Sequence, residues 1–147
     1  TGLIWKLPYG IYYMSCNLDH LLYGKLNSSD EEKEDDAYAF AKKYHVTLVL
    51  KGPHTLISDG NETYRIMSGN KGMSSAGMGD TLAGIISSFL GQGYLPKDAA
   101  ILGTYLHGLC GDEVYKENYT VVASKVIDQI PQMMKKLNKN RSAIPFL

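Results

Sequence analysis

The sequence predicts an α/β fold in which a mostly parallel β-sheet is flanked by helices. The run at residues 46–50 is entirely apolar apart from one threonine and is rich in β-branched side chains, as expected of a strand buried on both faces. A charged amphipathic segment precedes this run directly, and residues 82–90 repeat apolar side chains at helical spacing. Helices before and after a buried strand are typical of a sheet covered by helices.

Composition limits the classes of function. The chain has 147 residues, of which 44% are hydrophobic, and its 15 basic residues balance 15 acidic ones. Zero net charge argues against a general nucleic-acid or membrane-surface binder, and no apolar run is long enough for a membrane span. Cys16 and Cys110 lie far apart and fit reduced thiols. We therefore expect one domain over residues 1–147 in a cytoplasmic protein, with no nucleic-acid and no membrane partner.

The first part of the chain predicts small elements. Residues 1–16 suggest two short strands around a turn at Pro8-Tyr9-Gly10, with tyrosines that pack rather than bind a ligand. Residues 17–25 suggest a short helix.

A charged helix is predicted after the capping residues at 27–30. Acidic side chains begin it and Lys42, Lys43 and His45 end it, which complements the helix dipole. Its carboxylates could be imagined as a metal site, but a solvated helix face is the better interpretation. We expect a buried stripe made of Ala37, Phe40, Ala41 and Tyr44.

Lys51 to Thr55 follow the buried strand directly. They place a cation, a glycine and a hydroxyl at the strand's C-terminal end, which is where ligands bind in open α/β sheets. Residues 55–58 and 62–67 then flank Asp59-Gly60-Asn61, a strong hairpin signal.

The glycine-rich stretch at residues 68–82 is the central feature of the chain. It leads into the helix at 82–90, so the first helical turn is expected near residues 77–80, and Gly91 and Gly93 should end the helix. The N–H groups of such a turn, beside Gly77 and Gly79, form a hole for an anion, with Asp80 next to it. No P-loop or dinucleotide fingerprint is present. The simpler alternative is a capped helix after a flexible loop.

Pro96 opens the next predicted helix, as Pro favours the first helical position. Its broad apolar face is interrupted by Gly103, Gly108 and Gly111, which indicates close approach of another backbone or of a flat ligand. His107 fits a packed helix histidine better than a catalytic one. A last helix is expected over residues 123–137, with Pro131 as a kink or break.

Four motifs in this order resemble one known family. They are Leu50-Lys51-Gly52-x-His54-Thr55, Gly69-Asn70-x-Gly72-Met73, Gly77-x-Gly79-Asp80, and the run from Ile101 to Asp112. Together they resemble the C-terminal half of the ADP/ATP-dependent NAD(P)H-hydrate dehydratases, members of the ribokinase-like superfamily. The likeness extends from about residue 37 to residue 137.

The resemblance implies an activity and a set of site residues. Such enzymes repair NADHX and NADPHX by phosphorylating the added hydroxyl from ADP or ATP, after which phosphate is lost. It implies that Asp80 is the catalytic base and substrate contact, and that Gly77, Met78 and Gly79 form the anion hole. The implied nucleotide-binding residues are Lys51, Gly52, Pro53, His54, Thr55, Asn70, Lys71, Gly72, Met73, Ser74, Ser75, Ala76, Gly77, Met78 and Gly79. Mg²⁺ is a candidate counter-charge for the phosphates, but no ligand set in the chain identifies a metal site.

Two departures from the family keep other functions open. The first half of the family's domain has no counterpart, and its Thr-Pro-His-x-x-Glu stretch corresponds to residues 14–19, where only Asp19 resembles the acid. The alternatives are a truncated, catalytically silent nucleotide-binding or structural remnant, and a related small-molecule kinase. Because half of the usual sheet is absent, we also expect an exposed apolar surface that homo-oligomerisation covers.

Overall fold

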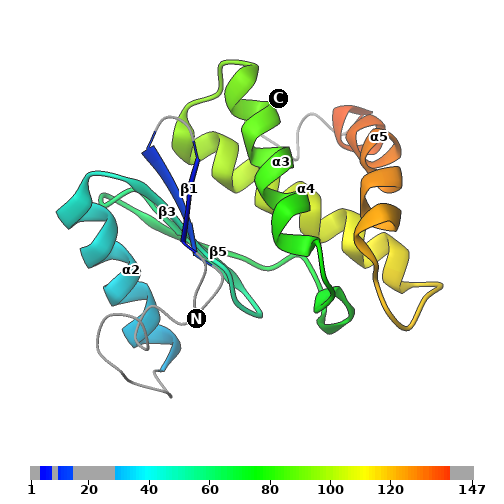
Figure 1. Ribbon diagram of the computed structural model, residues 1–147, viewed down its shortest axis with the longest axis horizontal. Helices are drawn as coiled ribbons and strands as arrows, with labels where there is room; N and C mark the ends of the chain where they lie inside the picture. The colour runs from blue at the N-terminus through cyan, green and yellow to red at the C-terminus, as the bar shows by residue number, and fades with distance from the viewer. Residues whose placement is uncertain (1–3, 8–9, 15–28, 140–147) are drawn as a thin grey trace.

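The protein is organised as a five-stranded sheet with helices on both faces (Figure 1). The computed structural model describes residues 4–7, 10–14 and 29–139. One helix, α2 (Asp30–Tyr44), covers one face of the sheet, and α3 (Met78–Gly91), α4 (Pro96–Tyr115) and α5 (Ala123–Lys139) lie on the other side. None of the described helices is long and apolar enough to cross a membrane.

The sheet runs in sequence order through β1 (Ile4–Leu7), β2 (Ile11–Met14), β3 (Thr47–Leu50), β4 (Thr55–Ser58) and β5 (Thr63–Ile66). Among the described strands, β2 and β3 alone pair in parallel; the pairs β1–β2, β3–β4 and β4–β5 are antiparallel. The expectation of a mostly parallel sheet is therefore wrong. Short turns join the three antiparallel pairs, and a short turn can only connect antiparallel neighbours, whereas the crossover through α2 permits the parallel pair.

β3 is buried on both faces, as its apolar run predicts. Leu48 and Leu50 face α2 and pack with Ala37 and Ala41, whereas Val49 belongs to the larger core beneath α3 and α4. This alternation follows from the two-residue period of a strand. Lys51, the next residue, is thereby placed at the sheet edge predicted for a ligand.

α2 begins with a capping box, in which Ser29 accepts the N–H of Glu32 and the Glu32 carboxylate accepts the N–H of Ser29. Arg65 on β5 pairs with Asp30 at 2.8 Å and with Glu34 at 2.6 Å, so part of the acidic face serves to hold the helix to the sheet. Tyr44 does not join the buried stripe; it is 51% exposed and packs its ring against Phe40 in the last turn of the helix.

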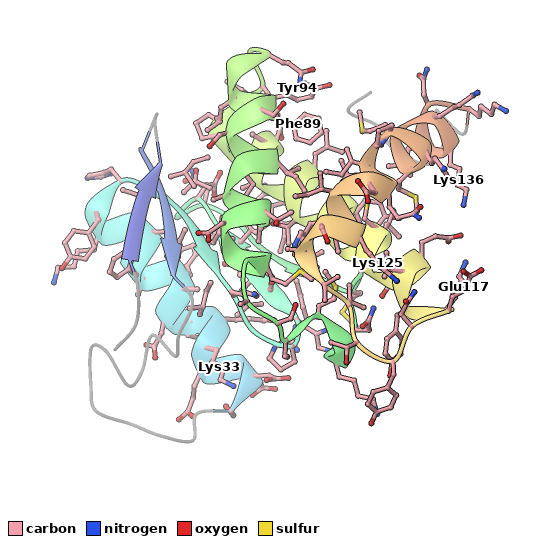
Figure 2. The ribbon with its side chains drawn as sticks, turned by 45° about the vertical axis from the view of Figure 1, so that its right-hand side comes forward. Lys33, Phe89, Tyr94, Glu117, Lys125 and Lys136 are labelled. Atoms are coloured by element: carbon pink, nitrogen blue, oxygen red, sulfur yellow. The ribbon has the colours of Figure 1, made fainter. Side chains whose placement is uncertain are left out.

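α3 buries the stripe that its periodicity predicts. All five members are buried: Leu82, Ile85, Ile86, Phe89 and Leu90. Past the C-terminal end of the helix the chain turns at Gly93, which has a φ of 90° and brings the Tyr94 ring edge-on to Phe89 (Figure 2). Gly91 is the last helical residue and does not adopt a positive φ.

The glycines of α4 let other segments approach its backbone closely. A β-carbon at Gly103 would lie 2.8 Å from the Ile86 side chain, and one at Gly108 would lie 2.6 Å from the backbone carbon of Ser68. One at Gly111 would lie 2.2 Å from Sδ of Met73. At Gly108 another backbone approaches closely, as the first alternative predicted, whereas at Gly103 and Gly111 the closest atoms belong to side chains.

α5 is one continuous helix through Pro131, so of the predicted kink or break the break does not occur. Pro131 has no N–H to donate to the carbonyl of Ile127. Both residues are exposed, so water can donate to that carbonyl instead. The helix predicted at residues 17–25, and Cys16, lie outside the described residues.

Cys110 is a free thiol in the middle of α4 and has no exposed surface. Burial raises the pKa of this thiol to about 11. It therefore behaves as a small apolar side chain in the core.

Gly108→Ala is expected to lower the free energy of unfolding by about 1–3 kcal/mol, because the new methyl group would overlap the Ser68 backbone. The matched control is Gly84→Ala in α3, where a β-carbon meets nothing within 4 Å. That change should stabilise the protein by up to about 1 kcal/mol through helix propensity. Urea denaturation measures both values, and equal effects of the two substitutions would contradict this account of α4.

Candidate nucleotide site

A cleft of about 720 Å³ lies where the loop after β3 meets the glycine-rich loop and α4. It brings together two groups of residues that are distant in sequence but were both predicted to bind nucleotide. The predicted residues that line it are Lys51, Gly52, Pro53, His54, Thr55, Asn70, Lys71, Met73, Ser74 and Ser75. Ser68, Gly69, Thr104, His107 and Gly108 complete the lining.

The glycine-rich loop is held in place by one carboxylate of α4. Asp112 accepts the Gly69 N–H at 3.0 Å with one oxygen and the Asn70 side-chain amide at 2.8 Å with the other. The Asn70 side-chain oxygen in turn accepts the Gly72 N–H at 3.0 Å. Gly69 has a φ of 105°, a conformation that a side chain would strain.

The far end of the loop is tied to the segment before α5. The Ser75 hydroxyl donates to the Val121 carbonyl at 2.6 Å, and the Val121 N–H donates to the Gly72 carbonyl at 3.0 Å. Gly72 itself packs under Tyr115, where a β-carbon would lie 2.6 Å from the ring. This residue, assigned to nucleotide binding from sequence, is thus outside the cleft lining, and its visible role is to let the loop pack.

The first turn of α3, where an anion hole is predicted, follows a glycine N-cap. Gly77 caps the helix with a φ of 82° and no side-chain hydrogen bond, and its carbonyl accepts from both the Thr81 N–H and the Thr81 hydroxyl. No side chain of the described residues caps the N–H groups that begin this helix. Met78 is fully buried, whereas Ala76 and Gly77 are exposed. None of residues 76–80 lines the nucleotide cleft.

Asp80 is exposed and lines a second groove, of about 520 Å³, between α3 and α5. The walls of this groove are mainly apolar and include Ile85, Ile127 and Met134. The predicted base is thus in the first turn of α3 and lines a different hollow from the cleft.

Lys51 brings a positive charge into the cleft lining. Lys51 is half-buried, and burial lowers the pKa of its ammonium. No ion pair or hydrogen bond of Lys51 occurs among the described residues. An anionic ligand would restore the favourable environment of this cation, so the residues present fit a phosphate-bearing group.

His107 is buried beside Lys51, with 5% of its surface exposed. Burial, with a smaller contribution from the nearby Lys51 charge, lowers the pKa of this imidazole to about 4, and a hydrogen bond with the Met78 backbone opposes the shift. It is a packed histidine, as predicted, but it also forms part of the cleft wall.

The comparison with known proteins decides the family. A family model described as NAD(P)H-hydrate dehydratase matches residues 19–132. The chain belongs to this family.

Named dehydratases and repair enzymes are similar to the chain over most of its length. The bifunctional NAD(P)H-hydrate repair enzyme Nnr of Moorella thermoacetica is 37% identical over 118 residues, covering 78% of this chain and 22% of that protein. The ADP-dependent (S)-NAD(P)H-hydrate dehydratase of Enterococcus faecalis is 42% identical over 98 residues, covering 66% of this chain and 33% of that protein. The chain thus spans a third or less of these two relatives.

Solved structures show that the fold is ribokinase-like. A ribokinase-like superfamily protein from Enterococcus faecalis superposes with a TM-score of 0.71 at 32% identity, covering 90% of this chain and 47% of that chain. The ADP/ATP-dependent NAD(P)H-hydrate dehydratase of Bacillus subtilis, co-crystallised with ATP and Mg²⁺, gives a TM-score of 0.68 at 29% identity. That match covers 72% of this chain and 39% of the other.

Sequence reasoning assigned no role to several residues that shape this dehydratase-family site. Asp112 stood in a quoted motif, but nothing local indicates that its partners are Gly69 and Asn70. The adjacent Gly111 was the available signal that the loop packs on this turn of α4, because the absence of a β-carbon there leaves room for the Met73 side chain.

The lowered pKa of His107 predicts a loss of stability in mild acid. Well above pH 6.5 the imidazole is neutral in both the folded and the unfolded state and contributes nothing to the pH dependence. As the pH falls toward the folded value of about 4, the unfolded chain binds a proton that the folded protein does not, so folding becomes less favourable. Between pH 7.5 and pH 5 this should lower the free energy of unfolding by about 2 kcal/mol.

Urea denaturation of the parent and of His107→Leu at both pH values measures this effect. The variant should lack this component of the pH dependence, since it cannot titrate at this position. Identical pH dependence of the two proteins would show that His107 is accessible to protons in the folded state.

Proposed function

We propose that this chain acts in ADP/ATP-dependent dehydration of (S)-NAD(P)H-hydrate, the repair of hydrated NADH and NADPH. The observation that carries the proposal is the cleft itself. In a chain of this family, it gathers Lys51–Thr55 and the loop from Asn70 to Ser75 next to an uncapped helix start. The proposed reaction is the one for which the relatives are named, and the cleft of this chain supports the binding of the nucleotide in that reaction.

In this proposal Lys51 neutralises phosphate charge, and the loop from Asn70 to Ser75 surrounds the nucleotide. The N–H groups that begin α3, at Met78 and Gly79, hold the phosphoryl group that is transferred, because a helix start favours negative charge. Mg²⁺, when bound with the nucleotide, would supply further counter-charge to the phosphates. ADP or ATP is the proposed co-substrate.

Asp80 is the proposed base and substrate contact. Its exposed carboxylate lines the α3–α5 groove, so a substrate hydroxyl that reaches it can transfer its proton there while the oxygen attacks the terminal phosphoryl group at the start of α3. The bond from that phosphorus to the bridging oxygen breaks, and AMP leaves from ADP, or ADP from ATP. The apolar walls of the same groove would exclude water from the reacting hydroxyl.

The principal alternative is a silent nucleotide-binding remnant, favoured by the partial coverage of the relatives. A kinase acting on a different small hydroxyl compound is the second alternative. An assay of NADHX consumption with ADP and with ATP separates the three functions. Dehydration yields NADH and free phosphate, a kinase accumulates a phosphorylated product, and a remnant binds ADP without turnover.

Asp80→Asn should reduce NADHX turnover by about 10²–10⁴-fold, the effect typical of losing a general base, while ADP affinity stays the same or increases. The substitution keeps the side chain's shape and removes one negative charge near the bound phosphates. Steady-state kinetics and calorimetric titration with ADP measure the two quantities.

Asp98→Asn is the matched control, because Asp98 occupies the first turn of the neighbouring helix α4 and lines neither the cleft nor the groove. Both substitutions should lower stability by at most about 1 kcal/mol through the helix dipole. Turnover of Asp80→Asn within twofold of the parent would leave Asp80 as a helix-start residue only.

We further propose that residues 1–147 form a single partial domain that self-associates in the cytoplasm. Large apolar side chains at the surface support self-association, including Met67 at 64% exposure and Leu95 at 68%. Light scattering at micromolar concentration tests it, and a monodisperse monomer would contradict it.

A further inference from the structure

Two buried polar atoms of α4 have no hydrogen-bond partner in the described structure. They are Oγ1 of Thr104 and Nε2 of His107, in residues that are 4% and 5% exposed. A buried polar atom without a partner costs free energy comparable to a lost hydrogen bond, so such atoms are uncommon and need an explanation. These two stand one helical turn apart, and both residues line the nucleotide cleft.

The hydrogen-bonding character of the His107 atom is determined by the rest of the ring. The imidazole bonds to the Met78 backbone, and Nε2 has no partner, so the Met78 bond is made through Nδ1. The bond to the Met78 backbone raises the pKa of the ring, so the Met78 carbonyl accepts it and Nδ1 donates. Nδ1 therefore carries the proton of the neutral ring, which leaves Nε2 with a lone pair. Nε2 is therefore an acceptor, whereas the Thr104 hydroxyl can donate or accept.

An acceptor in this position selects among the parts of a nucleotide. Phosphate oxygens are mostly ionised at neutral pH, because the second pKa of a phosphate is about 6, and an ionised oxygen cannot donate to Nε2. The ribose hydroxyls and the amino group of adenine can. The ribose is joined directly to the phosphates, and His107 is close both to Lys51 and to the Met78 backbone in the first turn of α3, where phosphates are proposed to bind.

We propose that Thr104 and His107 form a nucleoside-recognition pair in the wall of the cleft, which hydrogen-bonds a donor group of the nucleotide's sugar or base. The inference rests on the proposed function, because it takes a nucleotide as the ligand. It assigns the specificity of the cleft to α4, whereas the loops after β3 and β5 hold the phosphates.

Both polar atoms are covered by neighbouring atoms, so a ligand reaches them when a side chain of the wall moves aside. Lys51 lines the same wall and has a long, flexible stem. A phosphate that draws its ammonium outward would open the path to Thr104 and His107. Phosphate binding and nucleoside recognition would then be linked through this one lysine.

The test is a calorimetric titration of the full chain with ADP, 2′-deoxy-ADP, 3′-deoxy-ADP and IDP. The parent should bind one of the three analogues about tenfold more weakly than ADP, the loss expected for one hydrogen bond to a buried partner. In Thr104→Val and His107→Leu, ADP itself should bind about tenfold more weakly and the preference over that analogue should disappear. A deoxy analogue as the discriminated ligand identifies the sugar, and IDP identifies the base.

Thr47→Val is the matched control, since Thr47 is also buried, at 7% exposure, but begins β3 at the opposite end from Lys51. It should keep the parent's affinities. Thr104→Val is close to isosteric and removes a hydroxyl without a partner, so its melting temperature should not fall. If His107→Leu does not fold, the Thr104→Val titration decides alone.

The outcomes separate this inference from the proposed function. If the parent binds ADP but every variant keeps the parent's ligand preferences, or the parent shows none, the recognition pair is wrong and the nucleotide site stands. If the parent binds neither ADP nor ATP, the nucleotide site and the pair are both wrong.

Discussion

The structure of the site depends on how closely the glycine-rich loop can lie against α4. Gly108 and Gly111 remove the two β-carbons that would hold the loop away, and Asp112 on the same helix fixes the loop's backbone. A helix with ordinary side chains at these positions would push Ser68 and Met73 outward. The cleft between this loop and the end of β3 would then lose its wall.

This arrangement also separates charges that would otherwise oppose one another. Lys51 and the loop line the cleft, whereas Asp80 lines the groove shared by α3 and α5. An unpaired carboxylate in the cleft lining would repel phosphates directly. With separate hollows, the protein can present positive potential to an anion in one and a carboxylate to a neutral hydroxyl in the other.

Periodic features were predictable because their cause is local. The helical spacing of residues 82–90 and the apolar run ending at Leu50 both report which faces are buried, and both elements formed where expected. Strand direction was not predictable from the same evidence, because an apolar strand looks alike in parallel and antiparallel pairs. The length of each connection decides whether two strands run parallel or antiparallel, and three short connections correspond to the three antiparallel pairs.

Contacts between distant residues were the least predictable part of the site. The lining of the cleft by residues 51–55 and by residues 70, 71 and 73–75 followed from the family resemblance, since no local pattern relates the two loops. The partners of Asp112, the packing of Gly72 under Tyr115 and the separation of Asp80 from the cleft all depend on how α4 crosses the loop. Tyr44 shows the limit of periodicity, because the apolar stripe of α2 continues one turn beyond the sheet that could cover it.

The buried thiol of Cys110 can report how often α4 opens. Its raised pKa and lack of exposed surface keep it from forming the thiolate that alkylating reagents and oxidants attack. Modification of Cys110 therefore requires α4 to separate from its neighbours. Its labelling rate, resolved from that of Cys16 by peptide mapping, would report how often the helix that supports the cleft opens, without any added probe.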